Sequence, residues 1–113
     1  MRPLLLLLIS LTLSIPVWAA EGNATRGKSV TWVRCAPCHH LHTPYIKVGP
    51  SLKGIYGKKP SISGVPFKIW NLDTLTAWLN NPRAIKANTR MLLPKLSQRD
   101  RQDIIAWLKQ QSS

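Results

Sequence analysis

The chain has 113 residues and a strongly basic composition, with 16 Lys and Arg residues against 4 Asp and Glu residues and a formal net charge of +12. This length excludes an array of several domains and predicts one domain at most, whose small core would gain from a bound group. The charge excess bears on partners and on association rate rather than on the fold.

The first residues have the pattern of a secretory leader. A basic start at residues 1–3 precedes an apolar run at 4–17, and Val17-Trp18-Ala19 resembles a signal-peptidase site. We therefore expect a signal peptide over 1–19, cleaved after Ala19, and a folded domain over 20–113 that is periplasmic or otherwise exported. An uncleaved anchor is the alternative, but the run is short for a spanning helix, which needs ~20 apolar residues. An exported protein does not normally meet nucleic acid, so we expect no such partner.

The first half of the predicted domain contains one long helix followed by loops. Asn23 can cap a helix that runs to about Arg34, in which Val30 and Val33 form an i, i+3 apolar pair with Trp32 beside them. Prolines and glycines are then frequent over 41–70, which predicts loops and turns. Within that segment, residues 52–56 are expected to form one short helix.

Two further helices are predicted in the second half. Asn71 can cap a helix over 72–80, which ends before Pro82. Ser97 can open the last helix, where Asp100 favours the positive N-terminus. No alternating apolar pattern of useful length occurs, so we expect an all-α protein without a sheet. The buried face of the last helix is predicted to contain Ile104, Ile105, Trp107 and Leu108.

The only two cysteines lie in the sequence Cys35-Ala-Pro-Cys38-His39. This is the C-x-x-C-H pattern of c-type haem attachment, in which two thiols on one helical turn bond the haem vinyl groups. His39 would then bind the iron through an imidazole nitrogen. A thioredoxin-like dithiol is an alternative, but it needs a strand-helix-strand setting that is absent here. A zinc site with His42 as a further ligand is another, although ligands so crowded would strain a tetrahedron.

A second axial ligand can be sought among the remaining methionine and histidines. Met91 is the only methionine besides the initiator, and it lies far enough from His39 for the chain to fold around a haem. His40 and His42 are too close to His39 in the chain to reach the other haem face easily. Met91 is therefore the predicted second ligand, with an ordinary core methionine as the alternative.

These features occur together with further motifs that span nearly the whole predicted domain. In this combination the sequence resembles the class I c-type cytochromes, the soluble monohaem cytochromes c of mitochondria and bacteria. The resemblance implies an all-α cytochrome c fold, in which three to five helices wrap around one covalently bound haem and the first and last helices cross. In chain order the motifs are Gly27-Lys28, Cys35-Ala-Pro-Cys-His39, Gly49-Pro50-Ser51-Leu52, Leu79-Asn-Asn-Pro82, Thr89-Arg90-Met91 and Asp103-Ile-Ile-Ala-Trp-Leu108.

The resemblance also implies roles for residues around the haem. The Pro50 carbonyl would accept a hydrogen bond from the outer ring nitrogen of His39, which fixes the imidazole. Trp70 would donate its indole N–H to a haem propionate, with an ordinary core tryptophan as the alternative. Thr89 would lie beside Met91 and help to close the propionate edge.

The crossing of the terminal helices is also implied by the resemblance. Gly27 would allow their close approach, and Ile104 and Trp107 would fill the contact. One departure concerns Thr31, which stands where an aromatic residue often packs between these helices. We expect Trp32, at the next position, to take over that packing.

The resemblance implies a one-electron carrier rather than an enzyme, with one haem c, bound through Cys35 and Cys38, whose iron is ligated by His39 and Met91. A fixed haem subunit of a larger oxidoreductase is the first alternative, and a haem peroxidase with an open iron is the second. Expected partners are a redox protein with an acidic patch or a membrane oxidoreductase complex. The carrier itself is expected to be a monomer, with peripheral contact to the membrane surface. The basic residues expected around the haem edge are Arg34, Lys47, Lys53, Lys58, Lys59, Arg83 and Arg90.

Overall fold

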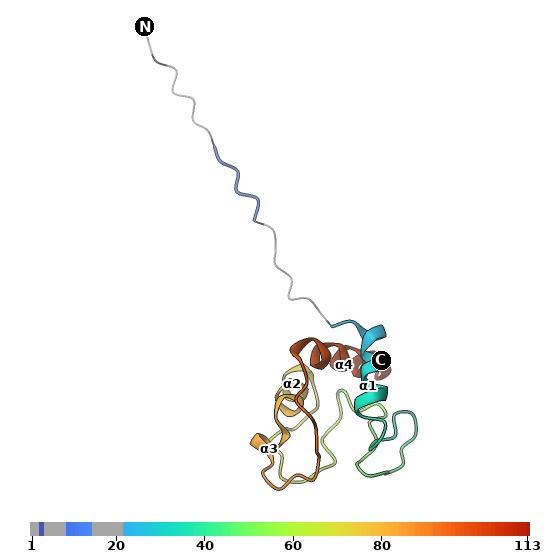
Figure 1. The fold of residues 1–113 in the computed structure, drawn as a ribbon. Helices are drawn as coiled ribbons and strands as arrows, with labels where there is room; N and C mark the ends of the chain where they lie inside the picture. The colour runs from blue at the N-terminus through green and yellow to red at the C-terminus, as the bar shows by residue number, and fades with distance from the viewer. Residues whose placement is uncertain (1–2, 4–8, 15–21) are drawn as a thin grey trace.

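The computed structural model describes residues 3, 9–14 and 22–113. In these residues it contains four helices and no β-strand: α1 (Ala24–Arg34), α2 (Leu72–Asn80), α3 (Pro82–Ile85) and α4 (Gln98–Gln111). Figure 1 shows the helices gathered in one body, with long loops closing the side away from α4. The all-α class expected from the sequence is therefore confirmed.

Most of the predicted leader, including the proposed cleavage site, lies outside the described residues. In the described stretch 9–14, Ile9, Leu11 and Leu13 are exposed and belong to no regular secondary structure. No helix in the described part of the chain combines the length and apolar character that a membrane crossing requires. The division into 1–19 and 20–113 stays a prediction.

Side-chain caps begin the three longer helices at the residues that the sequence predicted. Asn23 and Ser97 each accept a hydrogen bond from the backbone N–H three residues further on, at 2.9 and 3.0 Å. Asn71 forms a capping box with Thr74, since each side chain accepts from the backbone N–H of the other residue. These bonds satisfy N–H groups that have no partner within the helix.

The helix expected over Leu52–Tyr56 is absent, so that prediction was wrong. The segment forms turns, in which the Ile55 N–H reaches the Leu52 carbonyl at 3.3 Å without a continuing helical pattern. Gly54 and Gly57 have φ angles of +61° and +86°. These left-handed conformations cannot continue a right-handed helix, and glycine adopts them without steric cost.

The short helix α3 was not predicted, because Pro82 was interpreted only as the end of the preceding helix. Pro82 does end α2, but it also occupies the first position of α3. Proline suits that position because it lacks only an N–H that would be unpaired there. Asn81 caps the new helix by accepting from the Ala84 N–H at 3.3 Å.

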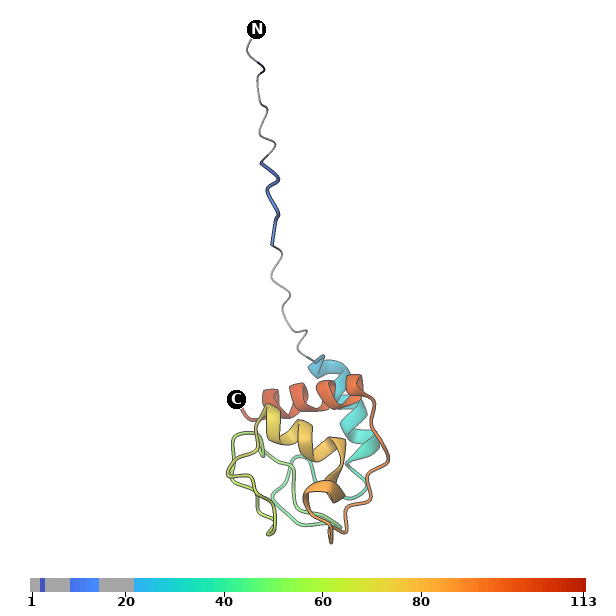
Figure 2. The same cartoon turned by 90° about the vertical axis from the view of Figure 1, so that its left-hand side faces the viewer.

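The two terminal helices cross in direct contact, as Figures 1 and 2 show. A Cβ atom on Gly27 would lie 1.8 Å from the Asp103 carbonyl oxygen and 3.1 Å from the Trp107 Cβ, so only glycine fits there. Thr31 is fully buried one turn further along, and its hydroxyl donates to the Gly27 carbonyl at 2.6 Å. With Ile104 also buried, the crossing expected from the family resemblance is confirmed.

Trp32 does not replace the missing aromatic residue in this contact, so that expectation was wrong. Its side chain is 48% exposed, whereas Thr31 is fully buried. Successive helical residues point about 100° apart, so only one of the two can face α4. Trp32 instead lies beside His42, with ring centroids 5.8 Å apart, and the His42 ring lies 6.1 Å from the Trp107 ring between centroids.

Besides α1 and α4, the core includes α2, which packs against α4. Its buried residues are Leu75, Trp78 and Leu79, which share one helical face. They join the buried residues of α4 and Leu96 in one continuous apolar cluster. The cluster extends to Cys35, so the core is continuous with the predicted haem-attachment segment.

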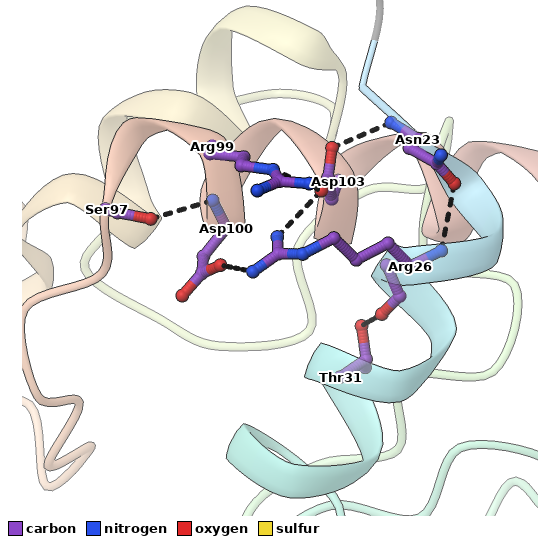
Figure 3. Close-up of polar contacts among 8 residues, drawn as sticks. Asn23, Arg26, Thr31, Ser97, Arg99, Asp100 and Asp103 are labelled. Carbon is purple, nitrogen blue, oxygen red and sulfur yellow. Dashed lines mark hydrogen bonds and ion pairs between the residues drawn. The ribbon is translucent and has the colours of Figure 1, made fainter.

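An ion cluster locks the N-terminal ends of α1 and α4 together, as Figure 3 shows. Arg26 donates from Nη1 to Asp103 Oδ2 at 2.8 Å and from Nη2 to Asp100 Oδ1 at 2.7 Å. The backbone N–H of Asn23 donates to the other Asp103 oxygen at 2.7 Å. Arg99 completes the set more loosely, at 3.9 Å from Asp103. Because Asp103 is buried, these bonds compensate for the loss of its hydration.

The pKa of Asp103 is lowered in the folded protein. Burial acts in the opposite direction, but the hydrogen bonds from Arg26 and from the Asn23 N–H, with the charges of Arg26 and Arg99, outweigh it. An unfolded Asp has a pKa of about 3.9. The ionised carboxylate therefore stabilises the fold above that pH, and the contribution is lost as the pH falls through the lower folded-state pKa.

Asp103→Asn should lower the free energy of unfolding by about 2 kcal/mol at pH 7, because it removes a buried charged hydrogen-bond acceptor. The difference in unfolding free energy between the variant and the wild-type protein should become smaller as the pH falls below about 4. Urea unfolding, followed by circular dichroism at a series of pH values, measures both effects. Arg26→Gln should unfold in acid at a higher midpoint pH than the wild type. Arg99→Gln should change this midpoint pH little, because the Arg99 side chain is 75% exposed. If the difference in unfolding free energy between Asp103→Asn and the wild type stays constant down to acid pH, ionised Asp103 does not stabilise the fold in this way.

Candidate functional site

The predicted haem-attachment segment forms a turn that continues directly from α1. The backbone N–H of Cys35 donates to the Thr31 carbonyl at 2.8 Å, and those of Cys38 and His39 return to the Cys35 carbonyl at 3.1 and 2.9 Å. The backbone is thus wound as one helical turn, which brings residues three apart to the same side. α1 therefore positions both thiols and the imidazole as one unit.

His39 is buried and held by its outer ring nitrogen. Nδ1 lies 2.6 Å from the Pro50 carbonyl oxygen. Because a carbonyl only accepts, Nδ1 must carry the proton, and the lone pair of the neutral ring is on Nε2. A Cβ atom on Gly49 would lie 2.4 Å from the His39 ring, so glycine lets the backbone pass beside the imidazole. The hydrogen bond expected between His39 and Pro50 is therefore present.

The two cysteines have different surroundings, and neither forms a disulfide. Burial raises the pKa of the Cys35 thiol to about 11, and the neighbouring charge of Cys38 acts in the same direction. A thiol that stays protonated at neutral pH is a poor attacking group for dithiol exchange. In the described part of the chain, no three His, Cys, Asp or Glu side chains are grouped so that they could hold a metal ion.

A cavity of about 410 Å³ opens beside this turn. Cys35, Cys38 and His39 line it, and so does Met91 from the loop before α4. Its volume lies in the range of small-molecule and cofactor sites, which is about 300–1,000 Å³. Most of the remaining lining is apolar and comes from α2, α4 and the loops: Val48, Pro50, Leu52, Ile55, Ile62, Trp70, Leu75, Trp78, Leu79, Leu92, Leu93, Ile104 and Leu108.

Met91 is presented by a loop that has few hydrogen bonds of its own. Its backbone N–H donates to the Thr89 hydroxyl at 3.2 Å, and the Thr89 N–H donates to the Lys86 carbonyl at 3.0 Å. All three residues line the cavity. The structure thus brings Met91 and Thr89 to the same cavity as the Cys35–His39 turn, as the family resemblance implied.

Two tryptophans lie in the cavity wall, and only Trp70 was predicted as a site residue. Trp70 is buried and packs against Trp78 of α2 with ring centroids 5.9 Å apart, and against Phe67 at 5.7 Å. Two backbone hydrogen bonds hold Trp70 in place: its N–H donates to the Lys58 carbonyl at 2.8 Å, and its carbonyl accepts from the Gly57 N–H at 2.6 Å. Trp78 was missed because its place on the apolar face of a helix gave no reason to separate it from the core.

The charged residues of the cavity lining are all cations in the described chain. They are Arg34, Lys86 and Arg90, of which Lys86 was not predicted. Two other predicted cations lie elsewhere: Arg83 borders a smaller depression of about 260 Å³ beside Met91, and Lys47 donates to the Ala36 carbonyl at 3.0 Å. Lys53, Lys58 and Lys59 are not part of the cavity lining.

These observations fit the haem that the sequence predicts. The paired thiols, the oriented imidazole and a thioether line one mostly apolar cavity. The cations at the same cavity suit the negatively charged propionates that a haem carries. Two thiols for covalent attachment, with an imidazole and a thioether for the iron, are the side-chain groups that hold a c-type haem.

Comparisons with known proteins lead to the same family. A family model described as cytochrome c matches residues 24–112. The cytochrome c of Cochliobolus lunatus is 34% identical over 103 residues, which cover 81% of this chain and 95% of that protein. The cytochrome c of Gibberella zeae is 35% identical over 101 residues, with coverage of 80% and 95%. The cytochrome c of Theileria parva is 32% identical over 103 residues, with coverage of 82% and 90%.

The matched region begins at the first residue of α1 and ends just after α4, so it includes all four helices of the described structure. Members of this family bind one haem c covalently and transfer electrons rather than catalyse a reaction. The chain belongs to the cytochrome c family and is a monohaem electron-transfer protein.

Proposed function

We propose that this protein is an exported one-electron carrier in which His39 and Met91 are the axial ligands of the haem iron. The single observation that carries the proposal is that Cys35, Cys38, His39 and Met91 all line one cavity. Residues from both halves of the chain therefore converge on the space where a haem would lie. Besides Met91, no other methionine lies in residues 22–113 to compete for the role.

The axial residues have distinct roles. The bound haem supplies a one-electron couple between Fe(II) and Fe(III). His39 would bind through Nε2, because its Nδ1 donates to the Pro50 carbonyl, and that bond raises the basicity of the imidazole. Met91 would supply a neutral thioether, which favours the reduced state. If His39 and Met91 both bound the iron, no position would be left on it for a substrate, which suits electron transfer rather than catalysis.

The cavity wall would tune the potential and hold the propionates. Its apolar lining disfavours the additional positive charge of the oxidised state, which raises the potential. Trp70 would donate its indole N–H to one propionate, and Thr89 would close the cavity at that edge. The Thr89 hydroxyl already accepts from the Met91 N–H, so Thr89 also orients the ligand residue.

The charge distribution supports a partner with an acidic surface. The cavity lining contains Arg34, Lys86 and Arg90 but no acidic residue of the described chain. Asp100 and Asp103, by contrast, are paired with Arg26 at the crossing of α1 and α4. The face around the cavity would thus attract an acidic redox protein or a membrane oxidoreductase complex and speed their encounter with a monomeric carrier.

Export is part of the same proposal. Residues 1–19 have the composition of a signal peptide, and the first helix of the described structure begins at Ala24. Cleavage after Ala19 would leave the hydrogen bond from the Asn23 N–H to Asp103 intact.

Replacement of both Cys35 and Cys38 by Ala should leave no covalently attached haem, because the two thioether bonds cannot form. Extraction of the purified protein with acidified acetone measures this: the variant should lose its colour, while the wild type keeps it. His40→Ala is the matched control, since it changes a neighbouring side chain outside the attachment pattern. Haem that remains with the double variant would refute attachment at these positions.

Met91→Ala should abolish the weak near-infrared absorption band that arises from sulfur bound to ferric iron. It should also lower the reduction potential, because a ligand that stabilises the reduced state is lost. Optical spectra of the oxidised holoprotein and a redox titration measure the two effects. If the band survives in the variant, Met91 is not the second ligand.

Oxidation of the reduced holoprotein by hexacyanoferrate(III), an anionic probe, should slow steeply as ionic strength rises. Arg90→Gln should lower the rate at low salt and flatten this dependence, because Arg90 lines the cavity. Lys109→Gln, in the last turn of α4, changes the net charge equally but should have a smaller effect. Stopped-flow kinetics provides the measurement, and identical salt profiles for the two variants would contradict steering by the cavity face.

A further inference from the structure

Lys86 differs from the other cations of the cavity lining, because it is partly removed from solvent. Arg34 and Arg90 also line the cavity, but both are exposed, whereas Lys86 is half-buried. Partial burial of a charged group carries a free-energy cost, which a neighbouring opposite charge can offset. Of the three cavity cations, Lys86 therefore has the greatest need of an anionic partner.

The described residues offer Lys86 no carboxylate. Every ion pair among them involves Asp100 or Asp103, and both of these carboxylates bind Arg26. The cavity lining, as far as the structure describes it, contains no Asp or Glu. A negative charge beside the Lys86 ammonium group would therefore have to come from a molecule bound in the cavity.

The backbone of Lys86 is fixed close to the loop that presents Met91. Its N–H donates to the Pro82 carbonyl at 2.9 Å, where it caps the C-terminal end of α3, and its carbonyl accepts from the Thr89 N–H at 3.0 Å. Lys86, Thr89 and Met91 all line the cavity. The position of Lys86 is thus defined relative to the residue proposed as the second axial ligand.

The side chain of Lys86 extends from this loop to the turn at Gly64. A Cβ atom on Gly64 would lie 3.1 Å from Lys86 Nζ and 4.0 Å from Lys86 Cδ. Ser61 and Ile62, which precede this turn, belong to the cavity lining. The ammonium group therefore lies where the segment before Met91 approaches the loop between residues 57 and 70.

We propose that Lys86 is the counter-ion of one haem propionate. The inference rests on the proposed function, which puts a haem in this cavity. A propionate is a carboxylate, and an ammonium group can donate up to three charge-assisted hydrogen bonds to such a group. Trp70 and Thr89, the residues already expected at a propionate, carry no charge. Lys86 would thus add the charge neutralisation that neither of them supplies.

This pairing has a consequence for the reduction potential. A nearby positive charge lowers the pKa of a carboxylate, whereas an apolar cavity without that charge raises it. Lys86 would therefore keep the propionate ionised in both redox states near neutral pH. Without Lys86, the propionate would bind a proton as the pH falls. The loss of its negative charge would disfavour the ferric state and raise the potential.

The test is a redox titration of the purified holoprotein at a series of pH values between about 5 and 8. The wild-type potential should stay constant over this range, whereas that of Lys86→Met should fall as the pH rises. Lys86→Arg keeps the charge and should keep the constant potential. Lys109→Met, in the last turn of α4, removes the same charge elsewhere and should also leave the potential independent of pH.

Three results would overturn the assignment. The first is a constant potential for Lys86→Met over the whole range. The second is an equal pH dependence in Lys86→Arg, which would point to altered packing rather than lost charge. The third is the pH dependence expected of Lys86→Met appearing instead in Arg34→Met or Arg90→Met, which would assign the propionate to that arginine.

Infrared difference spectra between the oxidised and reduced holoprotein give a second readout. At about pH 6, Lys86→Met should show the band of a protonated carboxylic acid that the wild type lacks. Isotopic labelling of the haem carboxyl carbons should shift this band, and a band that does not shift would contradict the pairing. Lys86→Gln is a second neutral variant in case Lys86→Met does not fold.

Failure of this inference can be distinguished from failure of the proposed function. Wild-type protein that contains no covalently bound haem would refute the proposed function and the pairing together. Wild-type protein with a reducible haem, combined with neutral Lys86 variants that match it in both measurements, would refute the pairing alone.

Discussion

The close crossing of α1 and α4 is the contact on which the rest of the structure depends. At Gly27 the two backbones approach so closely that a single methyl group would collide with the Asp103 carbonyl. The ion cluster around Asp103 then fixes the ends of both helices. Because the Cys35–His39 turn continues directly from α1, this crossing also determines where the attachment turn lies relative to the core.

From this anchor, the chain builds the proposed haem site out of two parts that differ in the number of their hydrogen bonds. The attachment turn is held by backbone bonds to α1 and by the bond from His39 to Pro50. The Met91 loop has fewer bonds, among them the one to the Thr89 hydroxyl. A covalently bound haem would connect the two parts across the cavity, which is a physical reason why a domain this small would depend on its bound group.

The separation of charge in space connects the fold to its function. The basic composition alone could mean no more than solubility. In the structure, however, two of the acidic residues are used to join α1 and α4, while the cavity lining contains only cations as charged groups. The loop that borders the same cavity adds exposed apolar side chains. The proposed haem ligands and these cations thereby line the same cavity.

Much of the site could be predicted from the sequence, because local chemistry requires it. The C-x-x-C-H pattern needs only one helical turn, and helix starts at Asn23, Asn71 and Ser97 follow from side chains that bond backbone groups three residues away. The predictions that failed concern places where local signals compete. The helix over 52–56 gives way to glycines in left-handed conformations, and Pro82 begins a helix as well as ending one.

What the sequence by itself determined are the haem-attachment pattern, the single candidate for the thioether ligand, the helical class and the basic charge. Only the tertiary structure decided which groups share a space with these residues. It placed Trp78 and Lys86 in the cavity wall, turned Trp32 outward where Thr31 faces α4, and left Tyr45, Ile46 and Val48 exposed. The physical reason is that burial and neighbourhood depend on how distant segments pack, and no local pattern of residues specifies that packing.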